Sequence, residues 1–278
     1  MIDLLYTYNH NGPGKVINNL KLGLEKIGIE YRDNPTTPDI NNFAVALQWN
    51  NNLYNYNPEK LLIGPNVSTL PIDNQFIMNG GYKKLIVPSG WVMDLYSMWI
   101  SKEKMSIWPV GVDTEKFSDK SKETKQFDCM IYFKRRSLED LLFIENMLRL
   151  KNQTYNTLTY GNYKEEEFID LISKSRYAIV VDNTESQGIA IQEMMSCGLP
   201  LFVWDVDRWV DRGDIFACKA SSIPFWDERC GVSVVEKNNI DESFDVFLNK
   251  IDFFDPRSYI LENLTLEKQA KELTNLFN

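Results

Sequence analysis

The sequence predicts an α/β protein made of two Rossmann-like domains that face a central cleft. Short apolar runs alternate with helical patterns along most of the chain, and strands that alternate with helices form parallel sheets covered by helices on both faces. A polar and charged stretch at residues 114–126 separates two such series and predicts a linker. The 278 residues, 44% of them hydrophobic, are enough for two cores of ordinary size.

The first series is the predicted N-terminal domain, residues 1–113. It opens with an apolar run at 2–8 and a Gly-rich turn at 11–14. A helix follows, with Val16, Leu20 and Leu24 on one face, and ends at Gly28. The later predictions are strands at 43–49, 61–64 and 84–87, a helix at 91–100, and a strand running into a loop at 107–113.

The second series is the predicted C-terminal domain, residues 127–255. The predicted strands lie at 127–133, 155–160, 177–181 and 199–204, and the predicted helices at 138–150, 165–174 and 188–197. The last segment, residues 256–278, carries one long helical pattern from 257 to 277.

Composition and charge argue against several other classes of protein. A net charge of −9 disfavours a protein that binds nucleic acid through a basic surface. The four cysteines form no CxxC pair and His10 is the only histidine, which disfavours a structural zinc site. The N-terminal residues are too polar for a signal peptide, and no apolar stretch reaches the about 18 residues of a membrane span. We therefore expect a cytoplasmic protein, for which peripheral contact with a membrane stays open.

The residues that carry chemistry are concentrated between Glu185 and Glu193. They follow an apolar strand and open a helix, at the end of a parallel strand where open α/β sheets bind ligands. Gly188 allows a ligand to approach the backbone, and the N–H groups of the first helical turn favour an anion. Glu193 lies within the helix, where its carboxylate can accept hydrogen bonds from two sugar hydroxyls. The structural alternative is a solvated Glu185 and a Glu193 that only favours the helix dipole.

This segment resembles the donor-site signature of the family-four retaining glycosyltransferases, which have the GT-B fold. The signature has a Glu, a Gly three residues later, a second Glu after seven intervening residues, and a turn with a small residue, Cys-Gly-x-Pro. The matching residues are Glu185, Gly188, Glu193, Cys197, Gly198 and Pro200. Further likeness at 11–14, 88–91 and 109–117 extends the resemblance over most of the chain. It implies that the segment 256–278 crosses back onto the N-terminal domain.

The resemblance also implies roles for single residues. Glu193 binds the ribose, Glu185 contacts the transferred sugar, and Tyr160 borders the base. Lys134 and Arg135 hold the diphosphate, although the family usually has its two cations further apart in sequence. Together with Glu185, these two cations are the catalytic candidates. The residues expected to bind the donor are Gly12, Pro13, Gly14, Tyr160, Gln187, Gly188, Ile189, Ala190 and Glu193.

The acceptor half of the expected site is less well defined. Many members of the family use an N-domain histidine further along the chain, and this sequence has none there. His10, beside the Gly-rich turn, and Asn66 are the acceptor-side candidates.

The sequence thus predicts a retaining glycosyltransferase that moves a hexose-type sugar from a UDP- or GDP-linked donor to a glycan, glycoprotein, glycolipid or other hydroxyl acceptor. It is expected to need no cofactor and no metal, because Lys/Arg and helix amides can stabilise the diphosphate. Asp205 and Asp207 form a DxD triplet of the kind that binds a metal in another glycosyltransferase fold, but they follow the wrong strand. A nucleotide-sugar epimerase of the GT-B fold and a noncatalytic nucleotide-sugar-binding module are the alternatives. The oligomeric state is left open.

Overall fold

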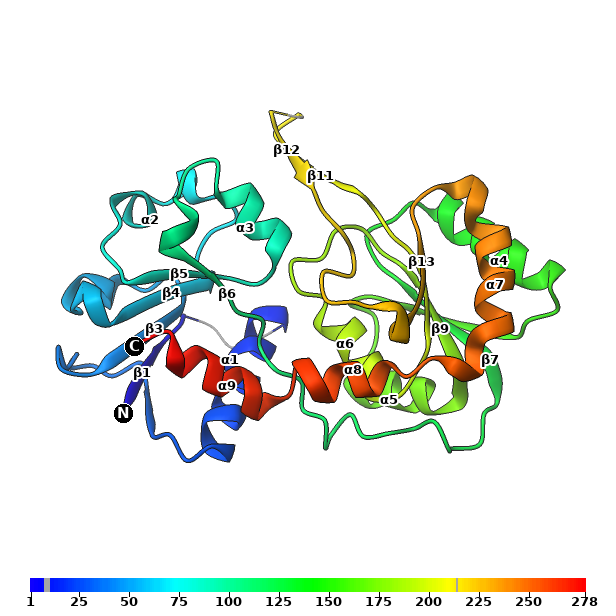
Figure 1. Ribbon diagram of the computed structural model, residues 1–278, viewed down its shortest axis with the longest axis horizontal. Helices are drawn as coiled ribbons and strands as arrows, with labels where there is room; N and C mark the ends of the chain where they lie inside the picture. The colour runs from blue at the N-terminus through cyan, green and yellow to red at the C-terminus, as the bar shows by residue number, and fades with distance from the viewer. Residues whose placement is uncertain (8–10, 214) are drawn as a thin grey trace. The chain divides into compact units, whose positions relative to one another are not determined.

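The computed structural model describes residues 1–7, 11–213 and 215–278, which divide into two compact units. The first unit contains Met1–Gly111 and Leu264–Asn278, and the second contains Val112–Asn263. Each is built around a parallel sheet with helices on both faces (Figure 1), which confirms the predicted α/β class.

The first unit has a six-stranded sheet in the order β2-β1-β3-β4-β5-β6, with all neighbours parallel. Its strands are β1 (Ile2–Leu5), β2 (Tyr31–Asp33), β3 (Phe43–Gln48), β4 (Leu61–Asn66), β5 (Lys84–Val87) and β6 (Met105–Ile107). Its helices are α1 (Asn11–Lys26), α2 (Gln75–Asn79), α3 (Gly90–Tyr96) and α9 (Leu266–Asn275). The central strands are buried on both faces, which explains why they are continuous apolar runs in the sequence.

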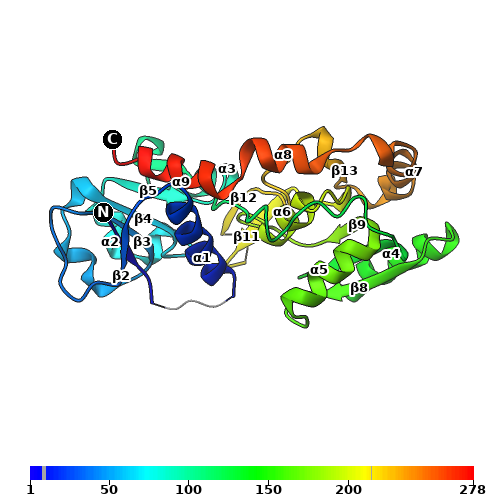
Figure 2. The same ribbon diagram turned by 90° about the horizontal axis from the view of Figure 1, so that it is seen from below.

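Helix α9 returns to the first unit and packs beside α1 (Figure 2), as the resemblance implied. The two backbones approach closely at Gly23, where an added Cβ would lie 2.7 Å from the Leu266 carbonyl oxygen. The Trp108 side chain is buried, and its indole N–H donates a hydrogen bond to the backbone carbonyl of Gln269 at 2.8 Å. The last helix is therefore part of the core of the first unit.

The predicted helix at 257–277 is in fact two helices. Helix α8 (Pro256–Asn263) belongs to the second unit, and Thr265 then caps the start of α9 by accepting a hydrogen bond from the Lys268 N–H. A cap interrupts the helical hydrogen bonds because the capping residue has an extended backbone, here with φ −72° and ψ 157°.

The second unit has a five-stranded parallel sheet in the order β13-β10-β9-β7-β8. Its strands are β7 (Phe127–Phe133), β8 (Tyr155–Thr159), β9 (Ser175–Val181), β10 (Leu201–Trp204) and β13 (Gly231–Val234). Its helices are α4 (Leu138–Leu150), α5 (Glu165–Lys174), α6 (Ile189–Ser196), α7 (Ile240–Lys250) and α8. A separate antiparallel hairpin, β11 (Arg208–Asp211) and β12 (Phe216–Lys219), lies between β10 and β13 in the chain.

One core of the second unit lies between the sheet and the helices α4 and α7. Ile144 and Leu148 of α4 and Phe244 and Phe247 of α7 are buried against apolar residues of β7, β9 and β10. The rings of Phe244 and Phe247 stack with centroids 6.1 Å apart. Tyr177 of β9 meets Phe247 edge-on at 5.3 Å. Such aromatic pairs each add about 0.5–1.5 kcal/mol beyond the area they bury, so this face of the sheet is held firmly.

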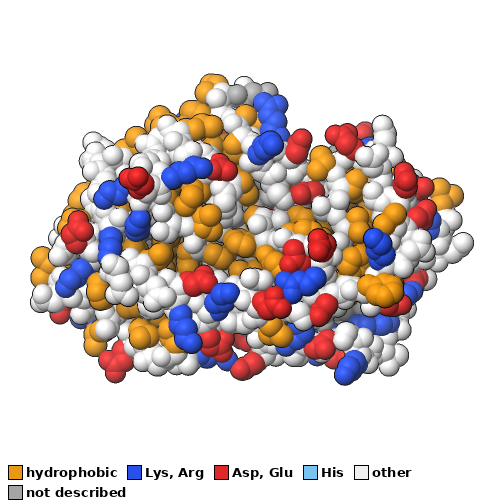
Figure 3. Space-filling model, in the orientation of Figure 1, with side chains coloured by type: hydrophobic (Ala, Val, Ile, Leu, Met, Phe, Trp, Pro, Cys, Tyr) orange, Lys and Arg blue, Asp and Glu red, His pale blue; other side chains and the backbone are white. Residues whose placement is uncertain are grey.

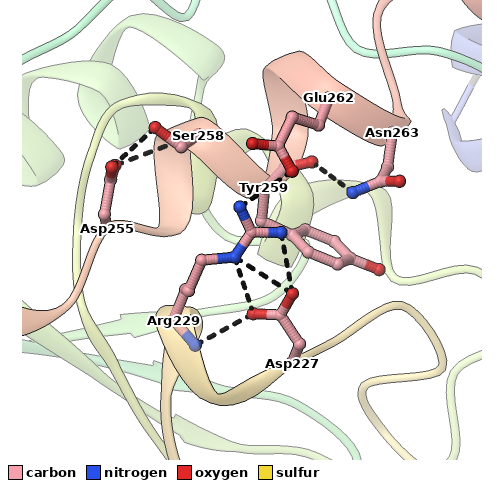
Figure 4. A network of polar contacts seen from close by, with 7 residues as sticks. All are labelled: Asp227, Arg229, Asp255, Ser258, Tyr259, Glu262 and Asn263. Atoms are coloured by element: carbon pink, nitrogen blue, oxygen red, sulfur yellow. Dashed lines mark hydrogen bonds and ion pairs between the residues drawn. The ribbon is translucent and has the colours of Figure 1, made fainter.

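Helix α8 is fastened to its own unit by the polar network of Figure 4. The Arg229 guanidinium donates to Asp227 at 2.9 Å and to Glu262 of α8 at 2.8 Å. Asp255 caps the first turn of α8 by accepting from Ser258. Hydrogen bonds to both carboxylates hold the pKa of Arg229 above its usual range, so the bridge stays charged.

On the face drawn in Figure 3, acidic and basic side chains are interspersed. The hairpin exposes apolar side chains as well, since Val210 and Ile215 are 47% and 73% exposed. None of the described helices combines the length and the apolar character that a membrane span requires.

Replacing Gly23 by alanine is expected to lower the free energy of unfolding by about 1–3 kcal/mol, because the new methyl group overlaps the backbone of α9. Gly12→Ala is the matched control in the same helix, since a Cβ there meets nothing within 4 Å. Chemical denaturation of both variants measures the difference. Equal stability of the two variants would contradict the packing of α1 against α9.

Candidate functional site

The candidate site lies where the strand order of the second sheet reverses. From β7 the chain continues to β8 on one side, and it then returns to form β9 and β10 on the other side. Phe133 is the last residue of β7, and Val181 is the last residue of β9. These two residues are paired in the sheet, so Lys134 and Asp182 follow them at the same carboxyl end of the sheet. The Lys134 N–H donates to the Val181 carbonyl at 3.0 Å, which fixes their spacing. Open parallel sheets bind ligands at such switch points, outside the carboxyl ends of the strands.

Lys134, Asp182 and Glu185 form a buried group of charges, the strand-end cluster. The Lys134 ammonium is paired with the Glu185 carboxylate and lies 4.0 Å from Asp182 Oδ2. It also lies 4.3 Å from the centroid of the Tyr160 ring, a distance suited to a cation–π contact. Lys134 is only 8% exposed and Asp182 is fully buried. The structure thus brings Lys134, Glu185 and Tyr160 together.

Asp182 is the member of this cluster that the sequence interpretation did not select. Its Oδ1 accepts from the Asn183 N–H at 2.7 Å, but its Oδ2 has no hydrogen-bond partner within the described part of the chain. Burial and the neighbouring charge of Glu185 raise the pKa of Asp182, while the Lys134 ammonium lowers it. The signal in the sequence that could have identified it is an acidic residue directly after a buried strand.

The turn before α6 brings backbone amides next to the cluster. Gly188 has φ +78°, a conformation that costs other residues about 1–2 kcal/mol, and it is the residue before the first turn of the helix. The Glu185 N–H is bound to the Ser221 carbonyl at 3.1 Å, so the loop at 221–222 holds this turn in place. The amides of Ile189 and Ala190 lie in the first turn of α6, where N–H groups lack helical partners.

Gln187 and Glu193 are both buried within this segment. The Gln187 amide donates to Gln192 Oε1 at 3.0 Å, and Gln192 donates back to the Gln187 carbonyl. Burial, with a smaller contribution from the nearby charge of Glu193, raises the pKa of Tyr163 to about 12. The Glu193 charge also helps to raise the pKa of Lys116, after the larger effect of Glu165.

The far end of α6 is fixed by Arg257 of α8. The guanidinium donates to the carbonyls of Ser196 and Phe117, and a cation at the C-terminus of a helix is favoured by the helix dipole. The Ser196 hydroxyl donates to the same Phe117 carbonyl at 2.8 Å. The helix that carries Glu193 is therefore held at both ends.

The two arginines after Lys134 have different surroundings. Arg136 lies 4.4 Å above the Trp204 ring and donates to Asp140 at 3.1 Å, so it is part of the fold. Arg135 is exposed and has φ +53°, which is strained for a residue with a side chain. Strained backbone at a strand end is common where a side chain is aimed at a ligand.

The prediction of a Gly-rich loop at 11–14 is wrong, because helix α1 already begins at Asn11. Gly12, Pro13 and Gly14 thus lie in the first helical turn. Proline is tolerated there, since the first N–H groups of a helix have no partner within it. His10 lies outside the described residues.

Asn66 and Ser89 are polar residues at neighbouring strand ends of the first unit. Asn66 ends β4 and Ser89 follows β5, its direct neighbour in the sheet. Asn66 Nδ2 and Ser89 Oγ are buried and have no hydrogen-bond partner among the described residues. Buried polar atoms without partners are rare, so both atoms are suited to bind a ligand.

Asp205 of the DxD triplet is used by the fold. Its carboxylate accepts hydrogen bonds from the Ser221 hydroxyl at 2.8 Å and from the Ser222 N–H at 2.7 Å. Across the described residues, no group of three or more His, Cys, Asp and Glu side chains is placed to hold a metal ion.

No protein-family model and no curated protein matches this sequence. The chain is nevertheless similar in structure to AviGT4, a glycosyltransferase involved in avilamycin A biosynthesis, with a TM-score of 0.60 at 12% identity over 99% of this chain and 96% of that chain. It is similar to sucrose-phosphate synthase from Thermosynechococcus elongatus, with a TM-score of 0.58 at 13% identity over 99% and 98% of the two chains. TarM of S. aureus, in a complex that contains UDP, has a TM-score of 0.58 at 14% identity over 95% of this chain and 59% of that chain. These similarities assign the GT-B fold to the chain.

Replacing Arg135 by glycine is expected to raise the free energy of unfolding by up to about 1 kcal/mol, because glycine adopts a positive φ without steric cost. The same variant is expected to bind UDP or GDP more weakly, because it lacks the exposed cation. Chemical denaturation and calorimetric titration measure the two effects.

Asn152→Gly is the matched control for Arg135→Gly. Asn152 is also exposed and has φ +54°, at the end of α4. This control should gain stability without losing nucleotide affinity. If Arg135→Gly binds UDP and GDP as tightly as the wild type, Arg135 does not contact the nucleotide.

Proposed function

We propose that the protein is a retaining glycosyltransferase that moves a hexose-type sugar from a UDP- or GDP-linked donor to a hydroxyl of a glycan, a glycoprotein or a glycolipid. The observation that carries this proposal is the pairing of Lys134 with Glu185 beside Gly188 at the strand switch point. A nucleotide sugar offers a diphosphate to the cation and the helix amides, and hydroxyls to the carboxylate. The GT-B fold, and the UDP in the TarM complex, support a donor of this class.

The diphosphate leaving group gains negative charge as the glycosidic bond breaks. Lys134, the exposed Arg135 and the first amides of α6 are the groups that stabilise it in this proposal. Hydrogen bonds to ionised groups are worth about 1.5–3 kcal/mol each, and fixed donors need no reorganisation during the reaction. The proposal includes no cofactor and no metal ion, because these groups supply the positive charge.

Glu185 is proposed to contact the transferred sugar, and Glu193 the ribose. Retention would follow from attack on the same face of the sugar, with the departing phosphate taking the acceptor proton. The buried thiols of the second unit are poor nucleophiles, since burial raises the pKa of both Cys197 and Cys230 to about 12. This chemistry needs no covalent enzyme intermediate.

Asn66 and Ser89 are proposed to bind the acceptor. A sugar hydroxyl both donates and accepts, so it can satisfy the Asn66 amide and the Ser89 hydroxyl, whose polar atoms lack partners among the described residues. Tyr160, whose ring contacts Lys134, is proposed to border the nucleotide base.

A thermal-shift screen against UDP, GDP and their hexose derivatives tests the donor class. Either the uridine or the guanosine compounds are expected to raise the midpoint temperature of unfolding. A ligand at about 100 times its Kd stabilises the folded state by about 2.7 kcal/mol. Product analysis with the sugar derivative that binds then separates transfer from epimerisation. Absence of any shift with all of these compounds would contradict the proposal.

Glu193→Ala and Glu185→Ala are expected to affect different steps. Glu193→Ala should weaken donor binding about tenfold or more, because ribose loses its charged acceptor. Glu185→Ala should mainly lower turnover, by about 100-fold or more, because a group at the reacting sugar is lost. Glu242→Ala, on the exposed side of α7, is the control. A donor-hydrolysis assay measures kcat and KM, and equal small effects of both changes would overturn these roles.

A further inference from the structure

Asp182 is a fully buried carboxyl group that the proposed chemistry does not use. The sheet places it at the end of β9, directly beside Lys134 at the end of β7. Its Oδ2 lies 4.0 Å from the Lys134 ammonium, which is too far for a hydrogen bond. Burying an ionised oxygen without a hydrogen bond costs free energy. We therefore expect this oxygen either to carry a proton or to gain a partner when a ligand binds.

The strand-end cluster has more acid than base. Two carboxyl groups, Asp182 and Glu185, share the Lys134 ammonium. The Arg136 guanidinium does not correct the imbalance, because it faces Asp140, Trp204 and the backbone carbonyl of Asp182.

The remaining titratable groups that face Asp182 are two tyrosines. Tyr132 of β7 and Tyr163, which lies before α5, interact electrostatically with the Asp182 carboxyl, and burial raises the pKa of both phenols. Both therefore stay neutral. A single proton on one carboxyl group would balance the cluster, and Asp182 is the more buried of the two acids.

A bound diphosphate changes this balance. Its two negative charges favour the protonation of any acid nearby. The Lys134 ammonium is committed to Glu185 in this structure, and it must be shared with or transferred to the phosphates when they arrive. Glu185 then keeps less of the Lys134 positive charge, and a protonated Asp182, which already interacts with Glu185, can donate a hydrogen bond to it.

We propose that Asp182 is a positioning residue that takes up a proton when the donor binds, and that this proton holds Glu185 while Lys134 turns to the diphosphate. This inference rests on the proposed function, because it requires a diphosphate at the strand-end cluster. The affinity for the donor should fall as the pH rises, because binding is coupled to proton uptake. For one proton the fall is at most about tenfold per pH unit.

Calorimetric titration tests the inference with UDP-glucose, UDP-galactose, UDP-N-acetylglucosamine and GDP-mannose. These diphosphate diesters have no terminal phosphate that titrates near pH 6 to 7. Titrations in buffers of different ionisation enthalpy, from about pH 6 to about pH 9, count the protons taken up. The wild type should take up between zero and one proton, with affinity falling towards high pH. Asp182→Asn should take up none and lose the pH dependence, while keeping its affinity at low pH.

Asp128→Asn is the matched control, because Asp128 lies in β7, the neighbour of β9, at the opposite end of the sheet from Asp182, and is bound to Thr154 and Arg176. It should keep the proton uptake of the wild type. Glu185→Gln should shift the uptake to lower pH, because it removes the negative charge that raises the pKa of Asp182. This variant decides the question even where Asp182→Asn does not fold.

The outcomes separate the inference from the proposed function. Binding by the wild type without proton uptake overturns the role of Asp182 and leaves the glycosyltransferase proposal standing. Unchanged uptake in Asp182→Asn, or no shift in Glu185→Gln, also overturns it. Failure of every nucleotide sugar to bind at any pH overturns both.

Discussion

The reversal of strand order between β7 and β9 is the constraint on which the rest of the candidate site depends. Because the chain leaves these neighbouring strands in opposite directions, the segments that follow them diverge and leave Lys134 and Asp182 together at one edge of the sheet. The segment after β9 continues through Glu185 and Gly188 into α6, so the same reversal brings two acids, a cation and the start of a helix to one place. The loop at 221–222 also holds this turn, because the Ser221 carbonyl accepts a hydrogen bond from the Glu185 N–H. No single residue in this set is unusual; their convergence comes from the topology.

Two buried carboxyl groups of this chain differ in how far the fold satisfies them. Asp3, at the start of the first sheet, accepts hydrogen bonds from Arg32 at 2.7 Å to each oxygen, and Tyr56 donates to it at 2.9 Å. Its lone pairs are satisfied within the fold, so it serves the architecture. Asp182 is equally buried, but one of its oxygens lacks a partner among the described residues, beside a cation that is paired elsewhere. Replacing such a group with an apolar one would often stabilise a fold, so an incompletely satisfied carboxyl group is a candidate for a functional role.

The sequence predicted what is encoded locally and missed what depends on distant partners. The strands at 127–133 and 177–181 and the helix after Gly188 have strong apolar patterns and were placed within a few residues of β7, β9 and α6. The prediction of a turn at 11–14 is wrong, because Pro13 favours the first turn of a helix and the two glycines beside it do not prevent one. The break between α8 and α9 was missed because Thr265 caps a helix without interrupting its apolar periodicity. Asp182 could be read as following a strand, but its importance depends on Lys134, which the sheet brings beside it.

The return of α9 to the first unit has a consequence for the order of synthesis. Residues 264–278 leave the ribosome after the whole of the second unit, yet α1 and Trp108 require them as packing partners. The first unit is therefore begun before the second and completed after it, so the flank of α1 that packs on α9 lacks this partner while residues 112–263 are translated. The second unit is continuous in sequence and has all of its residues before α9 is made, whereas the first unit receives its last packing partner only after the second unit is complete.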